Sequence, residues 1–125
     1  DGTPLATDDM TPDSHRWNAD IDPTVLIDDD GTPWIAWGNG DCYMARLKKN
    51  MYEIDGEVKK VPLRNYSEGP WLMKRNDIYY MIYAADAPGV QEEQMAYSTA
   101  PSIVRSLFTN GIKASFTLPM YAGIL

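Results

Sequence analysis

The stretch DPTVLIDDDGTPWIAW, residues 22–37, contains two short β-prone runs separated by a polar turn. Residues 24–27 and 34–37 are rich in β-branched, aliphatic and aromatic side chains, whereas residues 28–31 are three aspartates and a glycine. Two β-prone runs joined by turn-forming residues are typical of a β-hairpin. The sequence therefore predicts a hairpin over residues 24–37.

A second hairpin of the same kind is predicted over residues 70–84, with a turn at residues 75–77. Aligning Glu68 with Asp22 and allowing one inserted glycine brings the strands and turns of the two hairpins into step, at an offset of 46 residues between positions 22 and 68. The aligned aromatic pairs are Trp34 with Tyr80 and Trp37 with Tyr83. A repeat of about 40–50 residues is typical of β-propellers, in which each blade is a four-stranded sheet.

The rest of the chain also favours strands. Residues 42–47, 58–63 and 94–98 form further β-prone segments, and the apolar residues show little helical spacing. We therefore predict an all-β chain with about two blades of four-stranded antiparallel sheet. The expected division is a leading loop or edge at 1–20, a first blade at 21–66, a second blade at 67–103, and a divergent tail at 104–125 that contains no acidic residue.

Charge and composition exclude several classes of function. A net charge of −7 disfavours binding to nucleic acid or to anionic membranes, and no apolar run is long enough to span a bilayer. Cys42 and His15 are the only cysteine and histidine, so the chain cannot build an internal disulfide, a multi-cysteine metal site or a multi-histidine zinc site. We expect no metal and no cofactor, and the cellular location stays open.

Asp22 and Glu68 are the candidate catalytic residues, because the repeat gives them equivalent places in two blades. Blades are related by rotation about a central axis, so equivalent positions are expected to converge there. Two carboxyl groups in different environments can hydrolyse a glycosidic bond, one as proton donor to the leaving oxygen and the other by activating water. The alternative is that each carboxylate only caps a strand or pairs with a basic residue. Trp37 is the candidate for stacking on a sugar ring.

The amino-acid sequence of residues 17–103 resembles that of glycoside hydrolase family 43. The resemblance is carried by two acidic-proline motifs in order, NADIDPTV at residues 18–25 and EGPW at residues 68–71. Further matches are DDDG at residues 28–31, WGN at residues 37–39, and AYSTAPS at residues 96–102.

The resemblance implies a five-bladed propeller that cleaves xylan- or arabinan-derived substrates with inversion at the anomeric carbon. Glu68 matches the general acid of the family, and Asp22 matches the aspartate that modulates the pKa of the acid and orients the substrate. The family's general base lies on its first blade, which this chain is expected to lack. Asp8, Asp9 and Asp13 do not match it.

We therefore predict a glycosidase of the β-xylosidase or α-L-arabinofuranosidase type, acting on a xylo- or arabino-oligosaccharide and incomplete in this chain. A non-catalytic carbohydrate-binding or structural propeller fragment is the alternative. Two blades leave open edges and apolar faces, so we also expect a homo-oligomer or a partner chain that completes the propeller.

Overall fold

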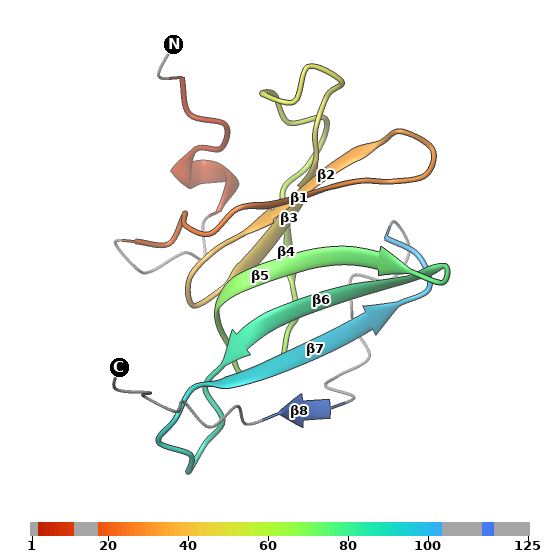
Figure 1. The fold of residues 1–125 in the computed structure, drawn as a ribbon. Coiled ribbons are helices and arrows are strands. Elements are labelled where there is room, and N and C mark those ends of the chain that lie inside the picture. The colour runs from red at the N-terminus through yellow and green to blue at the C-terminus, as the bar shows by residue number, and fades with distance from the viewer. Residues whose placement is uncertain (1–2, 12–17, 104–113, 117–125) are drawn as a thin grey trace, which may run out of the picture.

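The computed structural model describes residues 3–11, 18–103 and 114–116, and it is all-β apart from one short 3-10 helix, Asp8–Met10 (Figure 1). The chain forms two four-stranded antiparallel sheets, each with its strands in chain order. The first sheet contains β1 (Thr24–Ile27), β2 (Pro33–Trp37), β3 (Cys42–Arg46) and β4 (Lys59–Val61). The second contains β5 (Tyr66–Arg75), β6 (Ile78–Ala85), β7 (Gln94–Ala100) and β8 (Ala114–Phe116). These sheets are the two predicted propeller blades.

The strand registers confirm the internal repeat. In the first sheet Thr24 lies opposite Ala36, and Leu26 lies opposite Trp34. In the second sheet the aligned residues form the same pairs, Trp71 with Ile82 and Met73 with Tyr80. Because a slip of one residue would move every side chain to the other face, this agreement means that aligned residues occupy matching faces.

Two strands differ from the bounds expected from sequence. β5 begins at Tyr66, before Pro70, because a bulged register between Tyr66, Glu68 and Trp71 keeps the chain paired with β6 around the proline. β8 lies within residues 104–125, the range predicted as a divergent tail, and it supplies the fourth strand of the second sheet. The other residues of that range lie outside the part of the chain that the structure describes.

The main core lies between the two sheets. One face of the first sheet contributes Ala36, Cys42 and Met44, and it packs against residues of β5, β6 and β7. The residues of the second sheet in this core are Leu72, Tyr79, Met81, Tyr83, Ala85, Ala96 and Ala100. β5 contacts β1, β2 and β3, so it is the strand of the second sheet that joins the blades (Figure 1).

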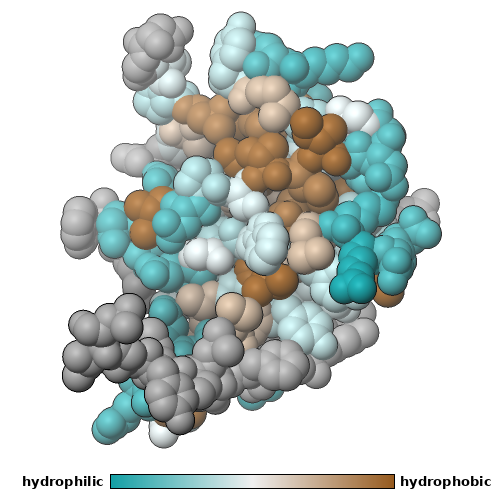
Figure 2. All heavy atoms as spheres, viewed as in Figure 1, coloured by the Kyte–Doolittle hydropathy of each residue, from teal (hydrophilic) through white to brown (hydrophobic). Residues whose placement is uncertain are grey.

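The outer face of the first sheet is also covered. On the outer face of the first sheet, a smaller cluster that includes Ile35, Trp37 and Tyr43 is packed against Leu5 and Ala6 of the N-terminal segment. Figure 2 shows a hydrophobic area in the part of the view where this segment and the first sheet lie.

Within the described residues, no helix is long and apolar enough to cross a membrane.

Candidate active site

Asp22 and Glu68 lie at equivalent places, where the chain enters the first strand of each sheet. Asp22 stands two residues before β1 with a φ of 56°, and Glu68 is the third residue of β5, in the bulged part of that strand. A left-handed backbone at an aspartate and a bulge at a glutamate both re-aim a side chain relative to a regular strand. Neither carboxylate therefore follows the regular alternation of a strand, in which side chains point to the core and away from it in turn.

A single turn connects the two acidic segments. The Gly38 N–H donates to the Ile21 carbonyl at 3.0 Å, and the Gly40 N–H donates to the Ser67 carbonyl at 2.7 Å. Ile21 precedes Asp22 and Ser67 precedes Glu68, so the turn at residues 38–40 is bonded to the neighbour of each carboxylate residue. Nothing in the amino-acid sequence indicated these two partners.

Tyr66, the first residue of β5, bonds to this turn from the strand that carries Glu68. Burial, together with the Cys42 thiol and the carboxylates of Asp22 and Glu68, raises the pKa of Tyr66 above its ordinary range. The hydroxyl therefore stays protonated, and it donates a hydrogen bond of 2.6 Å to the Gly38 carbonyl.

The two carboxylates differ in their exposure to solvent. Glu68 is half-buried, whereas Asp22 is exposed. The two carboxyl groups thus lie in unlike environments, as the paired carboxyl groups of glycoside hydrolases do.

Trp37 is buried at the end of β2, with 5% of its surface exposed. Its indole N–H donates to Asp20 at 2.9 Å, and its ring lies 6.0 Å from the ring of Tyr43. Together with Pro4, Leu5 and other residues, it also lines a cavity of about 330 Å³ next to the segment that contains Asp22. Its proposed contact with a sugar stays a prediction.

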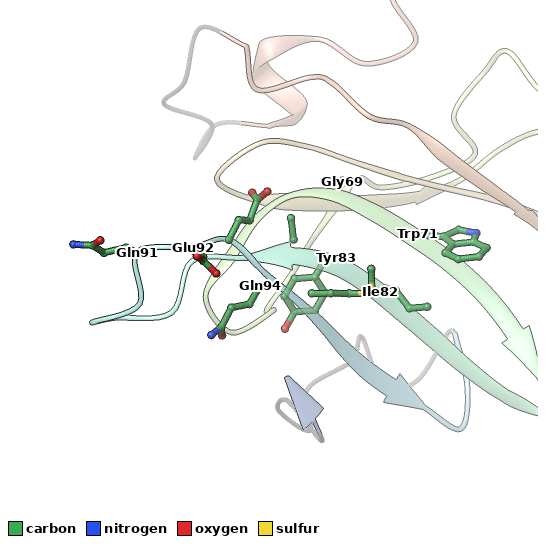
Figure 3. A pocket seen from close by; sticks show the side chains of 10 residues that line it. Gly69, Trp71, Ile82, Tyr83, Gln91, Glu92 and Gln94 are labelled. Carbon is green, nitrogen blue, oxygen red and sulfur yellow. The ribbon is translucent and has the colours of Figure 1, made fainter. Parts of the chain in front are cut away.

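A larger groove of about 610 Å³ begins next to Glu68, at Gly69. Trp71 and Ile82 line one part of it, on the neighbouring strands β5 and β6, while Gln91 and Glu92 approach from the connection between β6 and β7 (Figure 3). This groove lies on the face of the second sheet that points away from the first sheet.

A polar cluster that the sequence did not indicate connects the two blades at the far end of β5. Asp28, in the turn after β1, accepts hydrogen bonds from the Tyr79 hydroxyl at 2.5 Å and from Lys74 Nζ at 3.1 Å. Lys74 also pairs with Asp29 at 2.8 Å, and its ammonium group lies 4.8 Å from the centre of the Tyr79 ring. The pKa of Lys74 is raised by its hydrogen bonds to Asp29, Tyr79 and Asp28, so the cation is kept charged.

Comparison with known families agrees with the all-β fold of two antiparallel sheets. The family model of glycosyl hydrolases family 43 matches residues 7–107, which is most of the chain. The chain belongs to glycosyl hydrolase family 43. The family 43 match includes both acidic-proline motifs and seven of the eight strands that the structure describes.

Characterised family 43 relatives resemble the chain over most of its length. It is 32% identical over 83 residues to a β-D-galactofuranosidase of Aspergillus niger, covering 66% of this chain and 24% of that protein. It is 30% identical over 99 residues to an extracellular endo-α-(1→5)-L-arabinanase of Bacillus subtilis, covering 72% of this chain and 30% of that protein.

A solved structure shares the fold. An α-L-arabinofuranosidase of Clostridium thermocellum superposes with a TM-score of 0.67 at 22% identity, covering 79% of this chain and 34% of that one. The chain thus spans about a quarter to a third of the length of the relatives that it matches.

Proposed function

We propose that the chain is the acid-bearing part of a family 43 glycosidase that hydrolyses arabinose- or xylose-containing oligosaccharides. Glu68 acts as the general acid, and Asp22 tunes the acid and orients the substrate. The observation that carries the proposal is the pairing of a half-buried Glu68 with an exposed Asp22 at equivalent strand entries, joined by one turn.

The substrate class is supported by the relatives. Two of the three relatives described above are named for arabinose-containing substrates, and the third is named for galactofuranose. A neutral sugar also meets no electrostatic objection from a chain with a net charge of −7. We therefore place an α-L-arabinofuranoside first among the substrates, with a β-xyloside as the alternative.

In the proposed inverting reaction, Glu68 donates its proton to the glycosidic oxygen as the bond to the anomeric carbon breaks. Water attacks that carbon from the opposite face and gives its proton to a second carboxylate. An inverting pair lies roughly 6.5–9.5 Å apart to leave room for the water. We assign no described residue to this base, and we expect it to come from a blade outside the two described here.

The test is hydrolysis of aryl glycosides by the chain and by Glu68→Gln. The substrates are the nitrophenyl α-L-arabinofuranoside, β-D-xyloside and β-D-galactofuranoside. Loss of the acid should lower kcat by about 10²–10⁴-fold when hydrolysis is followed with arabino- or xylo-oligosaccharides, because their leaving group needs the proton and general acid catalysis contributes that much. The loss should be smaller with the nitrophenyl glycosides, because nitrophenolate is a good leaving group without a proton. The matched control is Glu57→Gln, which changes an exposed carboxylate in the connection between β3 and β4 and should leave the rate unchanged.

The competing proposal is a carbohydrate-binding or structural fragment without turnover. It predicts no nitrophenol release from any of the three substrates. Calorimetric titration with arabino- and xylo-oligosaccharides then separates a binding module from a structural one. Equal, measurable rates for the chain and Glu68→Gln would reject the assignment of the acid.

We propose further that the open face of the second sheet is covered by another sheet, from a second copy when the chain is alone. In the first sheet the row Thr24, Ala36 and Met44 lies on the face that packs against the second blade. The repeat-equivalent row of the second sheet is Trp71, Ile82 and Tyr97, and Trp71 is 58% exposed. The matching row of the first blade is covered by a four-stranded sheet, which supports the same kind of cover for the second.

A further inference from the structure

We propose that Tyr66 is a positioning residue, which locks the turn at residues 38–40 and thereby fixes the separation of Asp22 and Glu68. This inference deepens the proposed function and rests on it for the meaning of the two carboxylates. Tyr66 itself is not required to touch the substrate. Its role is exerted through the turn, at the Gly38 carbonyl.

The turn is held by bonds to both sides of the site. Gly38 and Asn39 donate to the carbonyls of Ile21 and Ala19, at 3.0 and 2.9 Å, in the segment that leads to Asp22. Gly40 donates to the Ser67 carbonyl at 2.7 Å, in the segment that leads to Glu68. These bonds use backbone N–H groups and leave the Gly38 carbonyl to be satisfied.

Tyr66 supplies the missing partner from the strand that carries Glu68. Its hydroxyl reaches across 28 positions of sequence to the Gly38 carbonyl at 2.6 Å. Its ring lies 5.5 Å from the ring of Tyr83, which is buried in the core between the sheets. One side chain thus connects the rigid core, the turn and the entry to β5.

The conformation of Gly38 makes the turn intolerant of small movements. Gly38 has a φ of +129°, and a Cβ added there would lie 2.0 Å from the Asp41 carbonyl oxygen. Backbone packed this closely has few alternative arrangements. A bond that holds Gly38 therefore sets the distance between the segments on either side of it.

The test compares Tyr66→Phe with Tyr83→Phe in the full 125-residue chain by nuclear magnetic resonance. Tyr83 is a matched control because its hydroxyl also donates to a backbone carbonyl, that of Arg64, at 3.1 Å. In Tyr66→Phe we expect the Gly38 and Gly40 amides to exchange with solvent about three- to tenfold faster than in the parent chain, after correction for global stability, as loss of one hydrogen bond implies. The carboxyl ¹³C resonances of Asp22 and Glu68 should shift as well.

Tyr83→Phe should lose similar stability while leaving those amides and carboxyl resonances unchanged. Equal responses in the two variants, or no response in Tyr66→Phe, overturn the proposal. A second measurement is made on the unmodified chain, where a scalar coupling from the Gly40 nitrogen to the Ser67 carbonyl carbon and a slowly exchanging Tyr66 hydroxyl proton are expected. Their absence also overturns it.

Kinetics separate this proposal from the proposed function. With an aryl arabinofuranoside, Tyr66→Phe should lower kcat and leave KM unchanged, because the acids are misplaced while binding persists. A parent chain that releases no nitrophenol contradicts catalysis by this chain alone, whereas the resonance measurements still decide whether Tyr66 positions the two carboxylates.

Discussion

At the scale of single residues, the chain contains acidic side chains with very different tasks. Asp22 and Glu68 were recognised from the sequence because they recur at one offset beside proline. Asp28 looked like one of three turn aspartates, yet it is the acceptor that binds both Lys74 and Tyr79 of the other blade. The three turn aspartates look alike in the sequence, and only their contacts in the folded structure distinguish Asp28 from the others.

Asp28 should make folding stability depend on acid pH. Burial alone would raise its pKa, but hydrogen bonds from Tyr79, the Asp29 N–H and Lys74 outweigh burial and hold the pKa below the ordinary value of 3.8. A lowered pKa in the folded state means that the stabilisation is fully present above pH 3.8 and is lost as the pH falls through the folded value. Asp28→Asn should therefore lower the melting temperature by about 5 °C near neutral pH, and by less in strong acid.

Thermal unfolding followed by circular dichroism between pH 2.5 and pH 7 measures this effect. Asp30→Asn is the control, because Asp30 accepts a bond only from the nearby Thr32 N–H in the exposed turn. Parallel melting curves for the parent chain and Asp28→Asn across the whole range would show that the cluster contributes no pH-dependent stability.

At the scale of elements, the two faces of β5 have different neighbours. Leu72 points into the core between the sheets and is 2% exposed, whereas Met73, the next residue, is half-exposed on the opposite face. Strand alternation requires this opposition, but it does not say which face is covered. The covered face follows from the packing of β5 against β1, β2 and β3.

Leu72→Ala should destabilise the chain by about 2–5 kcal/mol, because it opens a cavity in a packed core. Met73→Ala removes a side chain of similar size from the open face, and we expect it to cost about 1 kcal/mol or less. Urea unfolding at low protein concentration gives both values. Equal losses would mean that both faces of β5 are covered, contrary to the described packing.

At the scale of the whole molecule, one sheet is covered more completely than the other. The first sheet is packed on both faces, against the second sheet and against the N-terminal segment. The second sheet presents Trp71, Ile78 and Met95 to solvent on or beside its open face, at 58%, 40% and 45% exposure. Large apolar side chains gathered on one side of a molecule mark an interaction surface.

Trp71→Glu should convert an oligomer of the chain into a monomer, because it places a charge at the centre of the open face. Size-exclusion chromatography with light scattering measures the mass of both forms. The control is Tyr52→Glu, which changes a 72% exposed aromatic residue in the connection between β3 and β4. A parent chain that is a folded monomer at all concentrations would contradict self-association through this face.

Much of the fold was predictable because it is encoded locally. Hairpins at residues 24–37 and 70–84 follow from alternating β-prone runs around turn residues, and these residues need no distant partner to favour a strand. β8 was not predicted, since a three-residue strand is too short to show a period of two and is fixed by its pairing with β7. The start of β5 was missed because Pro70 normally ends sheet pairing, whereas here a bulge accommodates it.

Residue type and spacing along the chain are enough to predict the all-β class, the repeat of two blades and the two acidic residues that recur at their entries. Only the tertiary structure decided that Tyr66 and the turn at residues 38–40 connect those entries, and that Asp28 binds across the blades. These contacts join residues from 17 positions apart, for Ile21 and Gly38, to 51 positions apart, for Asp28 and Tyr79, and no local pattern of sequence encodes them.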